Sequence, residues 1–375
     1  MRVMYFINQI EKPGGIQRII INKANYLTDV FGYTVYICYL GNEGVVPAFM
    51  VSPNVKLVAI KNITRSSSFI RKFFDVFILL RQLCSIKRKY QLDIVINANT
   101  PLLSWIIPFL FNKIVCILEL HFSYDGQKIM DKKLCGKNFI KSFFLDCLRR
   151  LVFPKFSKIV ALTEIDKQKW EYDNMKVIPN FIDSLPVSKV NLIDKRVISV
   201  GRLSEEKGFD LLLLAWNYVK CNYPEWHLDI YGDGPLRNKL QKLICDLNLE
   251  KVVHLRGWTN CVESEYLHSS FYVMSSLYEG FPMVLLEAMS WGLPCISFNI
   301  SGAASIIKDT EDGMLVSQQN IDDLAKAICF LIENEVVRRK MSDNAVQNVK
   351  RFERDNIMSQ WKQLFQDCVN NKMIK

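Results

Sequence analysis

Two glutamates, Glu279 and Glu287, are separated by seven residues in the segment Glu-Gly-Phe-Pro-Met-Val-Leu-Leu-Glu. An ionised carboxylate accepts several hydrogen bonds, so a pair of acids beside a phosphate site suits the recognition of neighbouring hydroxyl groups. The same two acids could instead only complement the dipole of a helix N-terminus. Because short motifs specify little, the spacing alone favours this structural interpretation, and the surrounding residues must decide between the two.

The residues between the two glutamates predict an anion site. Gly280 and Pro282 indicate a turn that leads into a helix, because proline is favoured near the first helical position. The backbone N–H groups of Met283, Val284 and Leu285 would then lack partners within the helix and point at the loop. Such groups form a binding site for phosphate.

A second segment, Gly201-Arg202-Leu-Ser-Glu-Glu-Lys207-Gly208, follows an expected strand at Arg196–Val200. Arg202 offers a flat fork of donors to phosphate oxygens, and Lys207 supplies a mobile point charge. A solvated basic turn would be the commoner explanation if the flanking Gly201 and Gly208 were absent. With these glycines the segment predicts a second phosphate-binding element.

Two further candidates follow expected strands nearer the N-terminus. Gly14 and Gly15 come after the first strand, where a backbone without side chains lets a diphosphate approach closely. A plain tight turn would use the same residues. His121 ends the expected strand at residues 113–121, although a lone histidine is more often structural than catalytic.

The elements that must position these residues alternate between strand and helix patterns. In the first half we expect strands at residues 2–8, 34–40, 93–97, 113–121, 158–162 and 176–179, with helices at 15–30 and 69–90. In the second half we expect strands at residues 196–200, 226–231, 252–255, 271–275 and 294–298, with helices starting at 209, 236 and 282 and more at the C-terminus. This alternation predicts an α/β protein with parallel sheets and helices on both faces. Two such units indicate two facing Rossmann-like domains, with ligands bound in the cleft at the carboxyl ends of the strands.

Taken together, these motifs resemble the family-4 retaining glycosyltransferases of the GT-B fold. Residues 276–297, which include the glutamate pair, look like the core motif of that family. Residues 14–18, 177–183, 201–208 and 231–235 are similar to four further family motifs. The resemblance covers essentially the whole chain, and the motifs are specific in combination.

The resemblance implies a role for each candidate residue. Arg202 and Lys207 would bind the donor diphosphate, Glu287 the ribose and Glu279 the transferred sugar. His121 would lie beside the donor sugar, although Phe122 replaces the small polar or acidic residue that often follows it. The implied catalytic residues are therefore Glu279, His121, Arg202 and Lys207. The implied donor-binding residues are Gly15, Arg202, Lys207, Glu279, Phe281, Pro282, Met283, Val284 and Glu287.

The resemblance also implies the domain organisation. Residues 1–183 would form an N-terminal acceptor-binding domain and residues 184–355 a C-terminal domain that binds the nucleotide-sugar. Residues 356–375 would form a helix that returns toward the N-terminal domain. The boundary is expected in the polar stretch 184–194, which contains Pro186.

The function implied is a retaining transfer of a sugar, from a donor that we expect to be a UDP-sugar, to a lipid-linked or glycan acceptor in cell-surface polysaccharide biosynthesis. The chain contains no Asp-x-Asp motif, which metal-dependent sugar transferases use to hold a divalent ion, so we expect no metal or other cofactor. A nucleotide-sugar epimerase on the same scaffold and a catalytically silent nucleotide-binding subunit are the alternatives. The Gly14-Gly15 loop lacks the Gly-x-Gly-x-x-Gly spacing of an NAD oxidoreductase.

The positive charge of the chain is concentrated in its first half. The net charge is +10, and residues 1–183 carry 26 Lys and Arg against 14 Asp and Glu, which gives +12, while the remainder sums to −2. The segments 68–90 and 128–158 are basic and rich in phenylalanine. They could lie on an anionic membrane or be ordinary domain helices with solvated cations. Nucleic acid is disfavoured because no zinc-finger, helix-turn-helix or RNP-like motif is present.

The location expected from the sequence is the cytoplasm, at the inner face of the plasma membrane. The first residues do not have the charged start and cleavage site of a signal peptide. The 11 cysteines are scattered without a C-x-x-C pair, as is typical of reduced thiols. The longest apolar segment, residues 102–118, is interrupted by Pro108, Asn112 and Lys113, and we expect a buried helix followed by a buried strand there.

Overall fold

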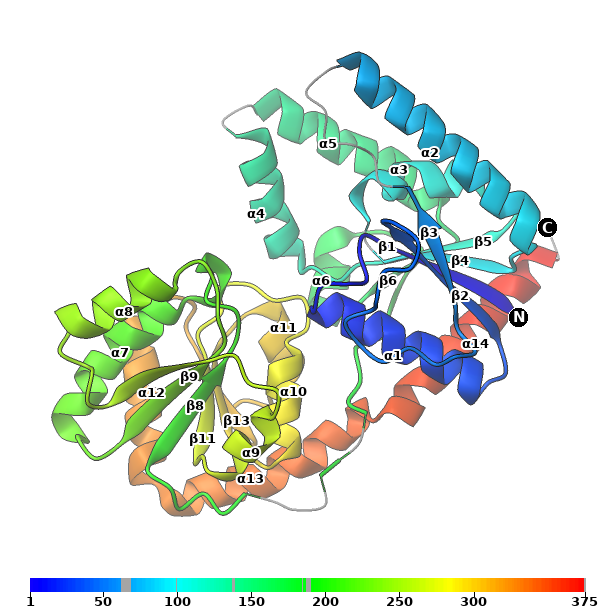
Figure 1. Cartoon of the computed structure of the whole chain (residues 1–375). Helices are drawn as coiled ribbons and strands as arrows, with labels where there is room; N and C mark the ends of the chain where they lie inside the picture. The colour runs from blue at the N-terminus through cyan, green and yellow to red at the C-terminus, as the bar shows by residue number, and fades with distance from the viewer. Residues whose placement is uncertain (62–68, 99, 137–138, 184, 187–189, 374–375) are drawn as a thin grey trace. The chain divides into compact units, whose positions relative to one another are not determined.

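The computed structural model describes residues 1–61, 69–98, 100–136, 139–183, 185–186 and 190–373 (Figure 1). The chain divides into two compact units. The N-terminal unit comprises Met1–His121, Lys128–Pro179 and Asp355–Lys375, and the C-terminal unit comprises Phe122–Gln127 and Asn180–Arg354. Ser184, the predicted start of the second domain, lies outside the described residues, as do residues 187–189 of the predicted boundary stretch.

The N-terminal unit is built on a seven-stranded sheet in the order β3-β2-β1-β4-β5-β6-β7, and every pair of neighbours is parallel. The strands are β1 (Arg2–Ile7), β2 (Thr34–Leu40), β3 (Lys56–Ile60), β4 (Ile94–Asn97), β5 (Val115–Glu119), β6 (Lys158–Ala161) and β7 (Met175–Val177). The strands at the centre of this sheet are buried along almost their whole length. Continuous apolar runs are what a sheet covered on both faces requires.

Helices cover both faces of this sheet (Figure 1). On one face lie α1 (Gly15–Asp29) and α14 (Arg354–Met373), and on the other lie α2 (Phe69–Tyr90), α3 (Pro101–Leu110) and α5 (Phe139–Val152). The unit also contains α6 (Glu164–Trp170) and most of α4 (Tyr124–Cys135). The last helix of the chain therefore completes the core of the first unit, into which it places Trp361, Leu364 and Phe365.

The C-terminal unit has a six-stranded parallel sheet in the order β10-β9-β8-β11-β12-β13. Its strands are β8 (Arg196–Val200), β9 (His227–Tyr231), β10 (Val253–Gly257), β11 (Phe271–Met274), β12 (Cys295–Phe298) and β13 (Gly313–Val316). Its helices are α7 (Phe209–Asn222), α8 (Arg237–Asp246), α9 (Val262–Leu267), α10 (Met283–Ser290), α11 (Ser301–Ala304), α12 (Ile321–Glu333) and α13 (Glu335–Val349). Both units share the Rossmann strand order, in which the winding direction reverses once near the middle of the sheet.

The predicted α/β class with parallel sheets is confirmed, while several elements differ from the prediction. β3 and β13 were not predicted, and both lie at an edge of their sheet, where partial exposure interrupts the apolar pattern. The strand predicted at residues 113–121 is shorter and ends at Glu119. None of the helices in the described part of the chain is long and apolar enough to cross a membrane.

Candidate active site

The C-terminal unit brings the predicted phosphate-binding residues to the point where the winding of its sheet reverses. β8 and β11 are hydrogen-bonded neighbours, and they are followed by connections that run in opposite directions. Arg202 and Lys207 follow β8, and Glu279 follows β11. In open parallel sheets, ligands bind outside the carboxyl ends of the strands at such a switch point.

Glycines allow the loops of this edge to pack backbone against backbone. Gly208 has a φ of +59°, and a Cβ on it would overlap the carbonyl oxygen of Ser275. Gly232, in the loop after β9, has a φ of +132°, and a Cβ on it would overlap the carbonyl oxygen of Gly201. An L-residue would meet both an unfavourable φ and a steric overlap at either position. The loops after β8, β9 and β11 are thereby held in close contact.

Lys207 and Glu279 form an ion pair that joins two of these loops. The side chains are 19% and 20% exposed, so the pair is partly shielded while still reachable from solvent. Ser276 Oγ lies 3.2 Å from Glu279 Oε1, and the hydroxyl of Ser275 donates to the carbonyl of Lys207 at 2.9 Å. The sequence assigned Lys207 and Glu279 to separate motifs, and the structure brings them together.

Arg202 precedes Lys207 in the same loop, and its side chain is exposed. Its carbonyl accepts the backbone N–H of Ser204 at 2.8 Å, which shapes the turn between β8 and the short 3-10 helix Glu205–Lys207. No ion pair or side-chain hydrogen bond to another described residue engages its guanidinium. All five of its N–H donors are therefore available to an incoming anion.

The start of α10 provides two of the three predicted N–H groups. Pro282 is the N-cap residue, and Met283 and Val284 in the first turn have no acceptor within the helix. The predicted role of Leu285 is wrong, because its N–H donates to the carbonyl of Pro282 at 3.0 Å. This hydrogen bond joins residues that are three positions apart instead of four, so the first turn of the helix is tighter than a regular α-helical turn. Sequence periodicity cannot reveal such a change.

The turn before α10 is fixed by buried contacts. The ring of Phe281 is buried and packs edge-on against Phe352, with ring centroids 5.5 Å apart. Gly302 leaves room for the turn, because a Cβ there would lie 2.8 Å from the carbonyl oxygen of Glu279. Glu287 is half-buried in the second turn of α10. Phe281 therefore holds the backbone of the predicted donor site in place through its side chain.

In the N-terminal unit, the candidate residues follow β1 and β5. Gly14 is the N-cap residue of α1 and Gly15 its first residue, and a Cβ on Gly15 would meet no atom within 4 Å. His121 lies two residues beyond the end of β5 and is buried. Burial lowers the pKa of His121 to about 4, so the imidazole is neutral at pH 7.

Two charged residues near His121 were not predicted from the sequence. Lys23 and Glu119 form an ion pair, and both side chains have zero exposure. Glu119 Oε1 also lies 3.5 Å from Nε2 of His121. The available signal was a single charge within each of two apolar runs, Ile-Ile-Ile-Asn-Lys23-Ala and Val-Cys-Ile-Leu-Glu119-Leu. Charged residues are almost never fully buried unless they are paired.

Acidic and metal-ligating side chains are dispersed over the described part of the chain. Nowhere in it do three or more His, Cys, Asp or Glu residues gather in a way that could hold a metal ion. Arg202 and Lys207 supply positive charge at the edge of the second sheet, close in sequence to β8.

Comparison with known proteins places this architecture in a family. Residues 183–348 match the family described as glycosyl transferases group 1. An uncharacterized glycosyltransferase of Haemophilus influenzae is 31% identical to the chain, and the match covers 96% of this chain and 99% of that protein. The family match includes the loops after β8 and β11 and the start of α10.

Two further similarities concern proteins with named substrates or ligands. The UDP-Gal:alpha-D-GlcNAc-diphosphoundecaprenol alpha-1,3-galactosyltransferase of Escherichia coli is 28% identical, over 85% of this chain and 86% of that protein. The structure of Anabaena Alr3699/HepE in complex with UDP and glucose superposes with a TM-score of 0.76 at 18% identity and covers 98% of this chain and 100% of that one. The second likeness supports the GT-B fold.

Proposed function

This chain belongs to the glycosyl transferases group 1 family, and from that premise we propose that it transfers a sugar from a UDP-sugar to a lipid-linked or glycan acceptor in cell-surface polysaccharide biosynthesis. We propose further that the transfer retains the anomeric configuration and takes place at the cytoplasmic face of the membrane. The named acceptor and donor of the Escherichia coli relative support both substrate classes.

The ion pair between Lys207 and Glu279 is the observation that carries this proposal. It places a cation and a carboxylate together at the switch point of the second sheet, between two loops that precede helices. The cation suits a diphosphate, and the carboxylate suits sugar hydroxyls. Arg202 and the N–H groups of Met283 and Val284 add donors for the diphosphate.

A panel of nucleotide-sugars measured by thermal shift tests the donor class. A ligand that binds the folded chain stabilises it by RT ln(1 + [L]/Kd), so the true donor should raise Tm most. We expect UDP-sugars to exceed sugars linked to other nucleotides. A protein that changes the sugar of the donor in the absence of any acceptor would be an epimerase, and this outcome would contradict the proposal.

Retention of configuration is the first prediction about the chemistry. NMR of the first-formed product, made from an α-linked donor, should show an α linkage, because both the donor bond and the new bond would lie on the same face of the sugar. Early time points exclude later rearrangement of the product. A β-linked product would contradict a retaining mechanism while leaving the transferase assignment intact.

The second prediction is that transfer does not depend on a metal. Arg202, Lys207 and the N-terminus of α10 would together neutralise the diphosphate leaving group, so turnover should persist in excess EDTA. A purified enzyme assayed with and without EDTA gives the comparison, and a metal-dependent sugar transferase serves as the positive control. Loss of turnover that Mg²⁺ or Mn²⁺ restores would reveal a metal site.

We also propose that the N-terminal unit contacts an anionic membrane peripherally through α2 and α5. The aromatic side chains of Phe74 and Phe77 on α2 and of Phe143 and Phe144 on α5 are each about 60% exposed. Solvent exposure of four phenylalanines on two helices is costly in water and favourable at a bilayer interface.

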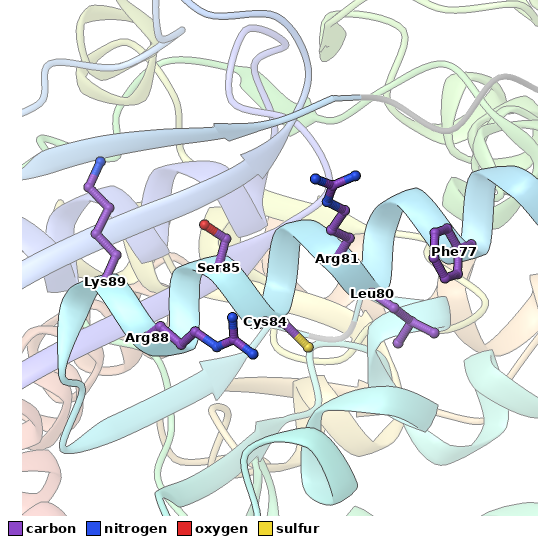
Figure 2. Close-up of a pocket in the computed structure, with 7 residues that line it drawn as sticks. All are labelled: Phe77, Leu80, Arg81, Cys84, Ser85, Arg88 and Lys89. Carbon is purple, nitrogen blue, oxygen red and sulfur yellow. The ribbon is translucent and has the colours of Figure 1, made fainter.

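Basic side chains accompany these aromatic residues on α2. A surface hollow of about 680 Å³ lies along the helix, lined by Phe77, Leu80, Arg81, Cys84, Ser85, Arg88 and Lys89. Figure 2 shows the side chains of these residues. The basic segment 68–90 also contains Arg71, Lys72 and Lys87. Lys87 is instead held within the protein, where it donates to the carbonyl of Leu110 at 2.6 Å, and the side chains of Arg71 and Lys72 lie outside the described part of the chain.

The third prediction concerns this membrane contact. Replacing Arg81, Arg88 and Lys89 together with Gln should weaken pelleting with anionic vesicles, because each cation near the surface contributes about 1 kcal/mol. Binding should also fall as salt shortens the Debye length from about 10 Å at 0.1 M to about 3 Å at 1 M.

A matched control removes the same charge from the other unit. Lys239, Lys242 and Lys251 are exposed in the C-terminal unit, and their replacement by Gln should leave pelleting unchanged. Equal binding of the wild-type protein to neutral and anionic vesicles would rule out an electrostatic contact. Equal weakening by both triple variants would show that net charge, and not α2, controls the binding.

A further inference from the structure

The buried ion pair between Lys23 and Glu119 is not explained by stability. Lys23 lies on α1 and Glu119 is the last residue of β5, and both side chains have zero exposure. The second carboxylate oxygen of Glu119, Oε2, is buried without a hydrogen-bond partner among the described residues. A buried pair with unsatisfied atoms seldom recovers the cost of removing both charges from water. Such a pair is better explained by an effect on a neighbouring group.

The ion pair with Lys23 holds the carboxylate of Glu119, and aromatic residues of two further elements lie close to this pair. Lys23 anchors the carboxylate from α1, and Nζ of Lys23 in turn lies 4.3 Å from the ring centre of Trp361 on α14. Tyr5 on β1 is fully buried nearby, and its pKa is raised by burial and then by the charge of Glu119. The hydroxyl of Tyr5 has no hydrogen-bond partner among the described residues. The carboxylate is therefore a fixed negative charge inside the N-terminal unit.

His121 is the residue on which this charge acts. Nε2 of His121 lies 3.5 Å from Oε1 of Glu119, and it is buried without a hydrogen-bond partner among the described residues. Burial lowers the pKa of His121, and the charge of Lys23 lowers it further while Glu119 opposes the shift. The imidazole is therefore neutral at pH 7 and carries one proton, on either Nδ1 or Nε2. A nearby negative charge favours the proton on the nitrogen that faces it.

We propose that Glu119, held by Lys23, is a positioning residue that fixes His121 as the Nε2–H tautomer. Nδ1 is then the acceptor nitrogen, and it can receive a hydrogen bond from a hydroxyl group of a bound sugar. This second step rests on the proposed function, whereas the tautomer is a property of the protein alone. The pair thereby connects the middle of α1 to the histidine that follows β5.

Nitrogen NMR of the protein labelled with ¹⁵N-histidine tests the tautomer without an activity assay. The chain has four histidines, and the signals of His121 are identified by their loss in the His121→Gln variant. We expect a neutral ring with protonated Nε2 at pH 7. In Glu119→Gln, where the fixed charge is lost, we expect a mixture of both tautomers. Protonated Nδ1 in the wild-type protein, or an unchanged tautomer in folded Glu119→Gln, would overturn the proposal.

Kinetics distinguish positioning from structural support. Glu119→Gln should lower kcat/KM by about tenfold to a hundredfold. A loss of this size is typical when a residue is removed that orients the side chain in contact with the ligand. The exposed Glu164→Gln, also in the N-terminal unit, is the control and should leave the rate unchanged. If Glu119→Gln alone does not fold, the neutral pair Lys23→Met with Glu119→Gln replaces it in both experiments. An altered tautomer in Glu119→Gln with unchanged kcat/KM would overturn the positioning role. A wild-type protein that transfers no sugar would instead refute the proposed function, and the tautomer result would still stand.

Discussion

Arg202→Ala and Lys207→Ala should each lower kcat by about 10²–10³-fold, the cost typical of removing one group that stabilises charge in a transition state. Cleavage of the bond between sugar and diphosphate puts growing negative charge on the phosphate oxygens. An interaction that strengthens as this charge develops accelerates the chemical step, and one that is constant only lowers KM. The loss should therefore appear in kcat beyond any rise in KM, as measured by steady-state kinetics.

Two controls separate this effect from general damage. Glu287→Ala should act mainly through KM for the donor, because ribose hydroxyls do not change charge during transfer. Lys195→Ala removes an exposed cation from the same unit and should leave both constants unchanged, since its pair with Glu225 lies at the surface. Near-normal kcat in a folded Arg202→Ala or Lys207→Ala enzyme would remove that residue from the proposed mechanism.

Lys207 carries an additional consequence because it is paired with Glu279. Loss of Lys207 leaves Glu279 without its cation, so part of the effect of Lys207→Ala should arise from a displaced carboxylate. A double-mutant cycle with Glu279→Gln measures this coupling, and residues in direct contact are expected to be non-additive. Arg202, which has no such pair in the described part of the chain, should be nearly additive with Glu279→Gln.

The features that the sequence predicted well are local in the chain. The helix Phe69–Tyr90 and the strand Thr34–Leu40 have the predicted bounds, because apolar periodicity and flanking polar residues mark both ends. The turn into α10 follows from Gly280 and Pro282, since proline restricts the backbone within a few residues. The roles of Arg202, Lys207 and the two glutamates come from the resemblance to a family, because local patterns alone do not determine them, and these roles stay predictions.

The features that the sequence did not predict depend on contacts between distant residues. The N–H of Leu285 donates to the carbonyl of Pro282 within the tightened first turn of α10. The strand β5 ends at Glu119, two residues before the predicted end. Lys23 and Glu119 are 96 positions apart, so nothing in either segment identifies its partner. A charge inside an apolar run indicates that some partner must exist, and only the tertiary structure shows which residue it is.

The same buried pair gives the largest effect on stability that we expect. Lys23→Met, which keeps the volume of the side chain, should destabilise the N-terminal unit by about 3–5 kcal/mol, because it leaves the carboxylate of Glu119 buried without a counter-charge. The double variant Lys23→Met with Glu119→Leu should recover most of this loss, since replacing both charges by apolar groups is often neutral or stabilising. Hydrogen exchange measures the loss of stability in each unit separately, through the amides of β5 in the N-terminal unit and of β8 in the C-terminal unit.

The amides of β8 serve as an internal reference, because β8 belongs to the C-terminal unit and should keep its protection in Lys23→Met. Lys195→Met removes one member of a surface pair whose side chains are 58% and 47% exposed, and this change should cost less than about 1 kcal/mol. Equal destabilisation by the single and double variants would mean that the shape of Lys23, and not its charge, supports the unit. Unchanged protection of β5 in Lys23→Met would mean that Glu119 takes up a proton there at little cost, and the fixed negative charge assigned to it beside His121 would then be wrong.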